Sequence, residues 1–149
     1  MRWRLCEDAH DLEVWARLHH ECMPYDDAPP AHHRRWLGCL GDRVVAVLAA
    51  DWLPVDRAVY LSLVAVCESA RGRRIQRRAI RHVESWAREH GAGGVISYTH
   101  SQNVASMASF IACGYRPYLP EVAWVGRDPR WVYWRRLLPA AHPPAIVKG

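Results

Sequence analysis

Five arginines fall within eight residues of one short segment, at positions Arg71, Arg73, Arg74, Arg77 and Arg78. Gly72 lies among them, between an apolar run that ends at Val66 and a helical pattern that begins at Ile75. The first amides of a helix have no intrahelical partner and lie at the positive end of the helix dipole. A glycine-containing turn at such a helix start, surrounded by guanidinium groups, is suited to an anion, and a pyrophosphate fits best.

The simpler interpretation of an arginine run is the solvated face of a helix. Here the arginines straddle a loop and the first turn of a helix, directly after an apolar strand, and do not lie along the flank of the helix. That position favours phosphate binding.

Periodic apolar residues predict the elements that hold this turn. The run over 58–66 is almost continuously apolar, which indicates a central strand covered on both faces. From Ile75 onward an apolar stripe recurs at helical spacing, charged residues face away, and Gly91 ends the helix. With a short strand over 95–99, these segments form a βαβ unit, which places a ligand at the carboxyl ends of the strands.

Further strands and helices are expected on both sides of this unit. The N-terminal part predicts a strand over 1–6, a helix from Asp8 or Asp11 through His19, a loop over 23–30, a short helix over 31–35, and a hairpin of strands over 36–40 and 43–50. The C-terminal part predicts a helix over 104–111 ended by Gly114, then strands over 115–119, extending toward Trp124, and over 131–138. The predicted class is α/β (α+β), with residues 1–138 as a single domain and 139–149 as a disordered tail.

The arginine-rich segment resembles the acetyl-CoA motif of the GNAT (Gcn5-related N-acetyltransferase) superfamily, V-x-P-x-x-R/Q-G-x-G-I-G/A or Q. The residues that match this motif in register are Val66, Arg71, Gly72, Ile75 and Gln76. Asn103 to Ser106, Phe110 and Gly114-Tyr115 resemble the later segment N-x-x-A/S…Y-x-x-x-G-F/Y of the family. The resemblance implies a mixed, mostly antiparallel sheet of about seven strands with about four helices, and transfer of an acetyl group from acetyl-CoA directly to a primary amine of a small molecule or protein.

The same resemblance implies how the cofactor is held. Backbone groups at Val64 and Val66 would pair with pantetheine, and the amides of the loop from Arg71 to Gln76 would cradle the pyrophosphate. The implied cofactor-binding residues are Val64, Val66, Arg71, Gly72, Arg73, Arg74, Ile75, Gln76, Asn103 and Ser106.

Two residues depart from the family pattern. Arg74 stands where the family usually has glycine, and Phe110 stands where many members have the tyrosine that protonates the leaving thiolate. Candidate substitutes for that acid are Tyr115, Tyr98 and Ser106, and His100 is a candidate base. Each of these four residues can equally be explained as part of the core or as a structural hydrogen-bonding residue. The departures also leave open a domain that binds CoA or a protein partner without turnover.

Composition narrows the remaining choices. The net charge is +5, with Lys148 as the single lysine, and such a surplus of positive charge can attract nucleic acid. No known DNA- or RNA-binding motif accompanies the arginines, so nucleic-acid binding is disfavoured. Five cysteines without a CxxC pair, and no apolar run of about 20 residues, predict a reduced, cytoplasmic protein that does not span a membrane. Many members of the family dimerise, so a homodimer is an open alternative.

Two further sets of residues have side chains that could bind a ligand. A zinc site is disfavoured because the spacing fits no common site for the candidate ligands His19, His20, Cys22, His32 and His33. Acidic residues in two loops would attract a cationic amine acceptor, although the preference is weak: Asp26, Asp27 and Glu121.

Overall fold

The elements in the structure follow the predicted order with one exception. The structure, a computed structural model of the chain, describes residues 1–126 and 128–139. The strands are β1 (Arg2–Leu5), β2 (Arg34–Leu40), β3 (Arg43–Leu53), β4 (Ala58–Val66), β5 (Gly94–His100), β6 (Arg116–Pro117) and β7 (Trp131–Leu137). The α-helices are α1 (Ala9–Cys22), α2 (Ile75–Glu89) and α3 (Val104–Ala112), with 3-10 turns at Pro54–Asp56 and Glu68–Ala70.

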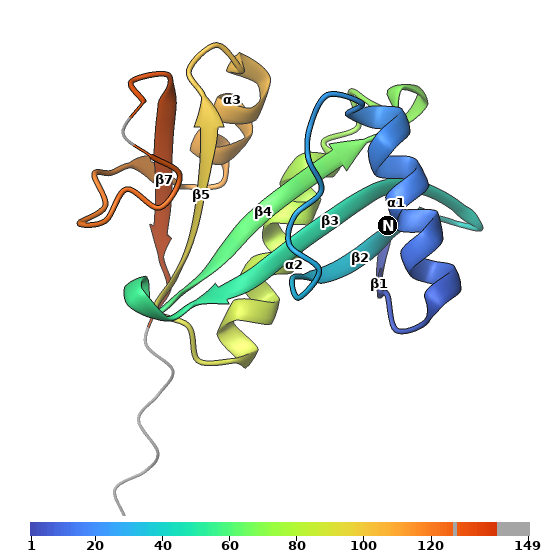
Figure 1. Cartoon of the computed structure of the whole chain (residues 1–149), viewed down its shortest axis with the longest axis horizontal. Coiled ribbons are helices and arrows are strands. Elements are labelled where there is room, and N and C mark those ends of the chain that lie inside the picture. Colours follow the sequence, from blue (N-terminus) through green and yellow to red (C-terminus); the bar gives the residue numbers. More distant parts are fainter. Residues whose placement is uncertain (127, 140–149) are drawn as a thin grey trace, which may run out of the picture.

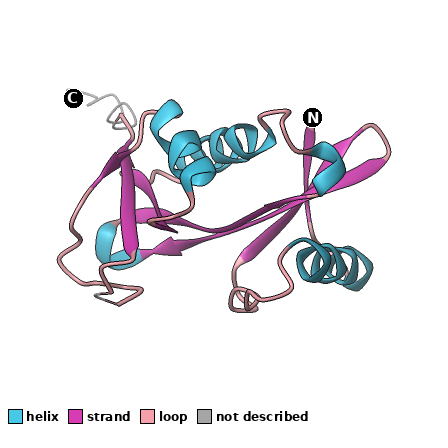
Figure 2. Ribbon diagram, turned by 90° about the horizontal axis from the view of Figure 1, so that it is seen from above, coloured by secondary structure: helices cyan, strands magenta, loops and turns pink. Residues whose placement is uncertain are grey.

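All seven strands form one mixed sheet in the order β1-β2-β3-β4-β5-β7-β6. Within the described part of the chain, β4 and β5 are the one parallel pair, and each other neighbouring pair is antiparallel. Helices cover both faces of the sheet (Figure 2). This arrangement agrees with the predicted class and with the expected mostly antiparallel sheet.

Strand β3 shows why the centre of the sheet is apolar throughout. Val47 and Ala49 pack toward Trp15 of α1, whereas Leu48 and Ala50 lie in the core on the side of α2. Because successive side chains of a strand point to opposite faces, a strand covered on both faces needs apolar residues at every position.

The predicted short helix over 31–35 is wrong. Arg34 and Arg35 belong to β2, where they pair with Ala50 and Ala49 of β3. Extending the hairpin supplies these residues with ladder hydrogen bonds that one isolated helical turn could not match. The structure therefore has three α-helices among its described residues.

Several boundaries also became definite. Asp8, one of the two predicted caps, accepts a hydrogen bond from the backbone N–H of Asp11 at 2.8 Å and begins α1. The strand predicted over 115–119 is reduced to two residues, Arg116–Pro117.

Apart from Pro139, the predicted tail lies outside the described residues. Among the described helices, none has both the length and the apolar character needed to cross a bilayer.

The parallel strands β4 and β5 meet at one end and then diverge (Figure 1). Their ladder joins only Ala58–Tyr60 to Gly94–Ile96. Just beyond it, the register between β3 and β4 shifts, so that Ser62 is an additional residue on β4. Such a bulge increases local twist and bends the strand, which accounts for the separation of β4 from β5.

Candidate active site

The turn between β4 and α2 has the backbone shape that an anion seat requires. Gly72 has φ +79° and Arg74, the N-cap residue of α2, has φ +59°. A side chain at position 72 would meet no atom within 4 Å, so the turn is open on that side. Arg74 occupies the left-handed region that explains the usual glycine at this motif position, and its side chain is exposed.

The first turn of α2 lacks the groups that ordinarily stabilise a helix start. The side chain of Arg74, the N-cap residue, makes no capping hydrogen bond to the helix amides. The first turn contains no acidic residue and carries Arg77. Positive side chains near the positive end of a helix dipole are unfavourable unless an anion is bound there. The charges and the uncapped amides are therefore matched to a phosphate group.

The edge of β4 that faces β5 supplies a second set of backbone groups. The N–H of Cys67 donates to the carbonyl of Val45 on β3 at 2.8 Å, and backbone groups of alternate residues point to opposite edges of a strand. The groups of Val64 and Val66 consequently point toward the gap opened by β5. Arg71 Nε donates to the Val66 carbonyl at 3.3 Å, which fixes the turn against the end of β4.

Helix α3 forms the opposite wall. Asn103 caps it by accepting from the N–H of Ser106 at 3.2 Å, and Ser106 Oγ accepts from Gln76 Nε2 at 2.9 Å. This bond joins the N-terminal turns of α2 and α3. A groove of about 570 Å³ runs between them and includes Val64, Val66, Arg71, Gly72, Arg74, Ile75, Gln76, Asn103 and Ser106. Nine of the ten predicted cofactor residues therefore line one groove, and Arg73 lies exposed beside it.

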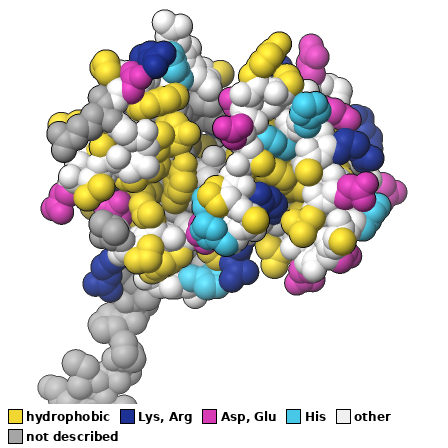
Figure 3. All heavy atoms as spheres, in the orientation of Figure 1, with side chains coloured by type: hydrophobic (Ala, Val, Ile, Leu, Met, Phe, Trp, Pro, Cys, Tyr) yellow, Lys and Arg dark blue, Asp and Glu magenta, His cyan; other side chains and the backbone are white. Residues whose placement is uncertain are grey.

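A second cavity of about 550 Å³ continues from the groove, and the two share walls at Met23, Val64, Gln76, Asn103 and Ser106. Apolar side chains, among them Leu61, Leu63 and Val64, and polar side chains together line this cavity. Figure 3 shows yellow side chains among white atoms on this face of the molecule. Asp26 and Asp27, from the loop after α1, lie on one side of this cavity, and Tyr98, His100 and Trp131 lie on the other. Glu121, the third acidic candidate, does not line it.

The four catalytic candidates lie in different environments. Ser106 is at the junction of the two cavities, and Tyr98 lines the second one. Burial raises the pKa of Tyr98, so its phenol stays protonated near neutral pH. His100 also lines this cavity, and its Nδ1 accepts from the N–H of Gln102 at 3.1 Å. An imidazole that accepts at Nδ1 has its ring N–H at Nε2, and that N–H can donate a hydrogen bond.

Tyr115 is not brought to the site. Its side chain is buried in the core against Phe110, at a ring separation of 5.1 Å, and lines neither cavity. Burial and then the charge of Glu84 raise the pKa of Tyr115. Its position directly after Gly114 did not reveal that the ring turns inward. Phe110 does reach the second cavity, where it presents an apolar edge.

Ser62 is one of the polar cavity residues that sequence reasoning missed, together with Ser97 and Thr99. It lines the second cavity and is the additional residue of the β4 bulge. A signal was present, because Ser62 is the one small polar residue in the otherwise apolar and aromatic strand Ala58–Val66.

The fold and sequence were compared with known proteins. A Bacillus subtilis acetyltransferase solved in complex with CoA shares 17% identity with a TM-score of 0.73, over 92% of this chain and 98% of that one. The ribosomal-protein-S18-alanine N-acetyltransferase of Escherichia coli shares 10% identity with a TM-score of 0.74, over 94% and 96%. A Bacillus anthracis protein solved with acetyl coenzyme A shares 17% identity with a TM-score of 0.61, over 79% and 68%. No curated protein sequence matches this chain.

At these identities the structural matches establish the fold alone. The sequence itself matches the model of the acetyltransferase (GNAT) family over residues 3–115, which is most of the chain and includes the turn at Gly72 and both walls of the groove. The chain therefore belongs to the acetyltransferase (GNAT) family.

Proposed function

We propose that this protein transfers an acetyl group from acetyl-CoA directly to a primary amine of a small molecule or a protein. The observation that carries the proposal is the uncapped start of α2, with its left-handed turn and arginines, opening into a groove that continues into a second cavity. Acetyl-CoA supplies the activated thioester. In this proposal the chain works in the cytoplasm, and a homodimer stays an open alternative.

The groove supports the assignment of the cofactor. The amides from Arg71 to Gln76 would hold the pyrophosphate, with Arg71, Arg73, Arg74 and Arg77 adding charge. The edge of β4 that β5 leaves unpaired at Val64 and Val66 would pair with pantetheine, because it presents backbone donors and acceptors toward the gap. The Val66 carbonyl also accepts from Arg71 Nε, and a carbonyl oxygen can accept a second hydrogen bond. An N–H on this edge would also polarise the thioester carbonyl as negative charge develops on its oxygen.

The second cavity would receive the amine. Asp26 and Asp27 would attract its ammonium form, while the aromatic rings of Tyr98 and Trp131 would contact its apolar part. The amine must lose a proton before it attacks, and the departing CoA thiolate must gain one. Tyr98 is proposed to protonate the departing thiolate, and His100 is proposed to take the proton of the amine, directly or through water, since both side chains line this cavity. Ser106, at the junction, is proposed to position the reacting groups.

A pair of glycine variants tests the cofactor site. Gly72 and Gly91 have φ of +79° and +72°, and an added Cβ at either would meet nothing within 4 Å. Gly72→Ala and Gly91→Ala should each destabilise the fold by about 1 kcal/mol through backbone strain. Only the first should weaken CoA binding in calorimetry, because its methyl group would hold the pyrophosphate away from the loop amides; the loss of one charge-assisted hydrogen bond corresponds to roughly 10–100-fold. Equal CoA affinity in the two variants would contradict the site.

Turnover is tested separately by thiol release across a panel of cationic and neutral amines. CoA binding without thiol release from any amine would favour the second candidate function, a GNAT-like domain that binds CoA or a protein partner without catalysis. The apolar Phe110 at the cavity wall is the observation that favours this second candidate.

A further inference from the structure

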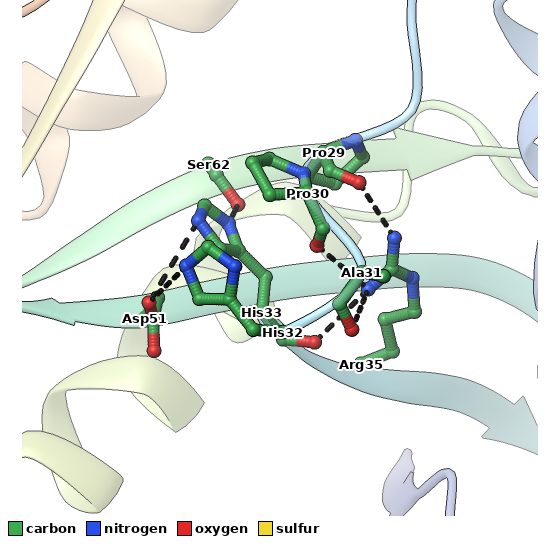
Figure 4. Close-up of polar contacts among 8 residues, drawn as sticks. All are labelled: Pro29, Pro30, Ala31, His32, His33, Arg35, Asp51 and Ser62. Atoms are coloured by element: carbon green, nitrogen blue, oxygen red, sulfur yellow. Dashed lines mark hydrogen bonds and ion pairs between the residues drawn. The ribbon is translucent and has the colours of Figure 1, made fainter.

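A cluster of three metal-binding side chains lies at the junction of the loop after α1 and the sheet. His32 and His33 end that loop, and Asp51 projects from β3 (Figure 4). The Nε2 atoms of His32 and His33 lie 3.0 and 3.8 Å from the same oxygen, Oδ2 of Asp51. One donor atom from each residue lies within 4.8 Å of the other two.

These separations fit one small ion. Two metal–ligand bonds of about 2.05 Å at the tetrahedral angle hold their ligand atoms roughly 3.3 Å apart. The observed separations from Asp51 of 3.0 and 3.8 Å lie on either side of that value. The three donor atoms lie within 4.8 Å of one another, so the two imidazoles would move toward each other as they close on the ion. His32 is largely exposed, which leaves an entry path and a fourth coordination position open to water.

The hydrogen bonds around His33 orient it as a ligand. Its Nδ1 lies 2.9 Å from Ser62 Oγ, and either atom can be the donor of this hydrogen bond (Figure 4). When the ring proton is on Nδ1, Ser62 accepts it, and the lone pair of Nε2 faces Asp51 and is available to a cation between them.

The loop that carries the two histidines is held in place before any ion binds. The guanidinium of Arg35 donates to the carbonyls of Pro29, Pro30, Ala31 and His33 at 2.7, 3.1, 3.3 and 3.0 Å. Arg35 is itself stacked over Trp15, with its central carbon 4.7 Å from the ring centre. A site with fixed backbone loses little entropy when the ion binds.

We propose that His32, His33 and Asp51 bind a divalent transition-metal ion, and that zinc best matches this set of two imidazoles and one carboxylate. The spacing along the sequence argued against zinc because Asp51, the third ligand, comes from a different element. The ion would clip the loop after α1 to β3. The same loop carries Asp26 and Asp27 into the second cavity, and Ser62 contacts both the cavity and His33. The proposed metal site does not rest on the proposed acetyl transfer, and its test does not measure acetyl transfer.

The test uses untagged, reduced, full-length protein stripped of metal with a chelator. Calorimetry with Zn²⁺ should give one saturable site, and Co²⁺ should give a tetrahedral absorption spectrum without a thiolate-to-cobalt charge-transfer band. His32→Ala and Asp51→Asn should each weaken Zn²⁺ binding at least about tenfold. The melting temperature should rise with Zn²⁺ concentration in the wild type and not in His32→Ala.

His10→Ala is the matched control, since His10 is an exposed histidine on α1 away from the cluster. This variant should bind Zn²⁺ as the wild type does. Because His32 is exposed, His32→Ala should keep the apo melting temperature, so lost binding would not reflect lost folding. No saturable Zn²⁺ binding by the wild type, undiminished binding by His32→Ala, or a thiolate-to-cobalt band would each overturn the proposal.

Discussion

We expect substitution of Glu84 to reduce the free energy of unfolding more than substitution of other charged residues. Glu84 is fully buried on α2, yet it contacts three arginines from two elements. Arg81 Nη1 donates to both carboxylate oxygens at 3.2 and 3.1 Å, Arg88 lies at 3.7 Å, and Arg136 of β7 donates from the sheet. Glu84 thus ties α2 to the strands on the far side of the cleft.

Glu84→Gln keeps the shape of the side chain but removes its charge and turns one acceptor into a donor that faces guanidinium N–H groups. One charge-assisted hydrogen bond contributes about 1.5–3 kcal/mol, and breaking a buried ion pair costs about 3–5 kcal/mol. The arginine side chains are 49%, 43% and 29% exposed, so water can solvate them again and the upper values do not apply. We expect a loss of about 2–3 kcal/mol in the free energy of unfolding.

Urea denaturation measures this change directly, and the melting temperature should fall by about 4–12 °C for a domain of this size. Glu89→Gln is the control, because Glu89 is exposed on the same helix and should change stability by less than about 0.5 kcal/mol. A loss in Glu84→Gln no larger than in Glu89→Gln would refute the view that this cluster holds α2 to β7.

Three other substitutions or reactions probe separate features. Gly94→Ala should cost about 2 kcal/mol or more, because its Cβ would lie 2.8 Å from the carbonyl oxygen of Arg136; unchanged thermal melting would contradict this. Arg74→Gly should raise the free energy of unfolding, measured by urea denaturation, by up to about 1 kcal/mol, because relief of left-handed strain exceeds the entropy cost of glycine. Burial, and then the nearby Cys67 thiol, raise the pKa of Cys22 to about 11. Its alkylation, followed by peptide mass spectrometry, should therefore be slow near about pH 8 and still be accelerating above about pH 9, whereas a plateau below that pH would disagree.

Local pattern predicted the central elements well. Residues 58–66 form β4 as expected, and α2 begins at Ile75, where the apolar stripe begins. The helix expected over 31–35 failed because the prediction weighed only neighbouring residues, whereas Arg34 and Arg35 pair with a strand some 15 residues away. A ladder with a distant partner outweighs a weak local preference.

Part of the candidate site could likewise be predicted from adjacent residues, and part could not. The turn from Arg71 to Gln76 could be predicted because all its features, namely positive φ, free amides and arginines, lie within a few successive residues. The inward turn of Tyr115 and the approach of Asp51 to His33 could not, since each depends on which elements pack together.

Neighbouring residues alone were enough to predict a strand, a glycine turn and an arginine-rich helix start in succession. Backbone conformation and the helix dipole depend on adjacent residues. Three other features come from packing between distant segments: β4 and β5 diverge at the Ser62 bulge, Glu84 contacts Arg136 across 52 residues, and Asp51 lies beside the two histidines. Those contacts follow from strand register and helix packing, which are set by the burial of the whole core and not by any one segment.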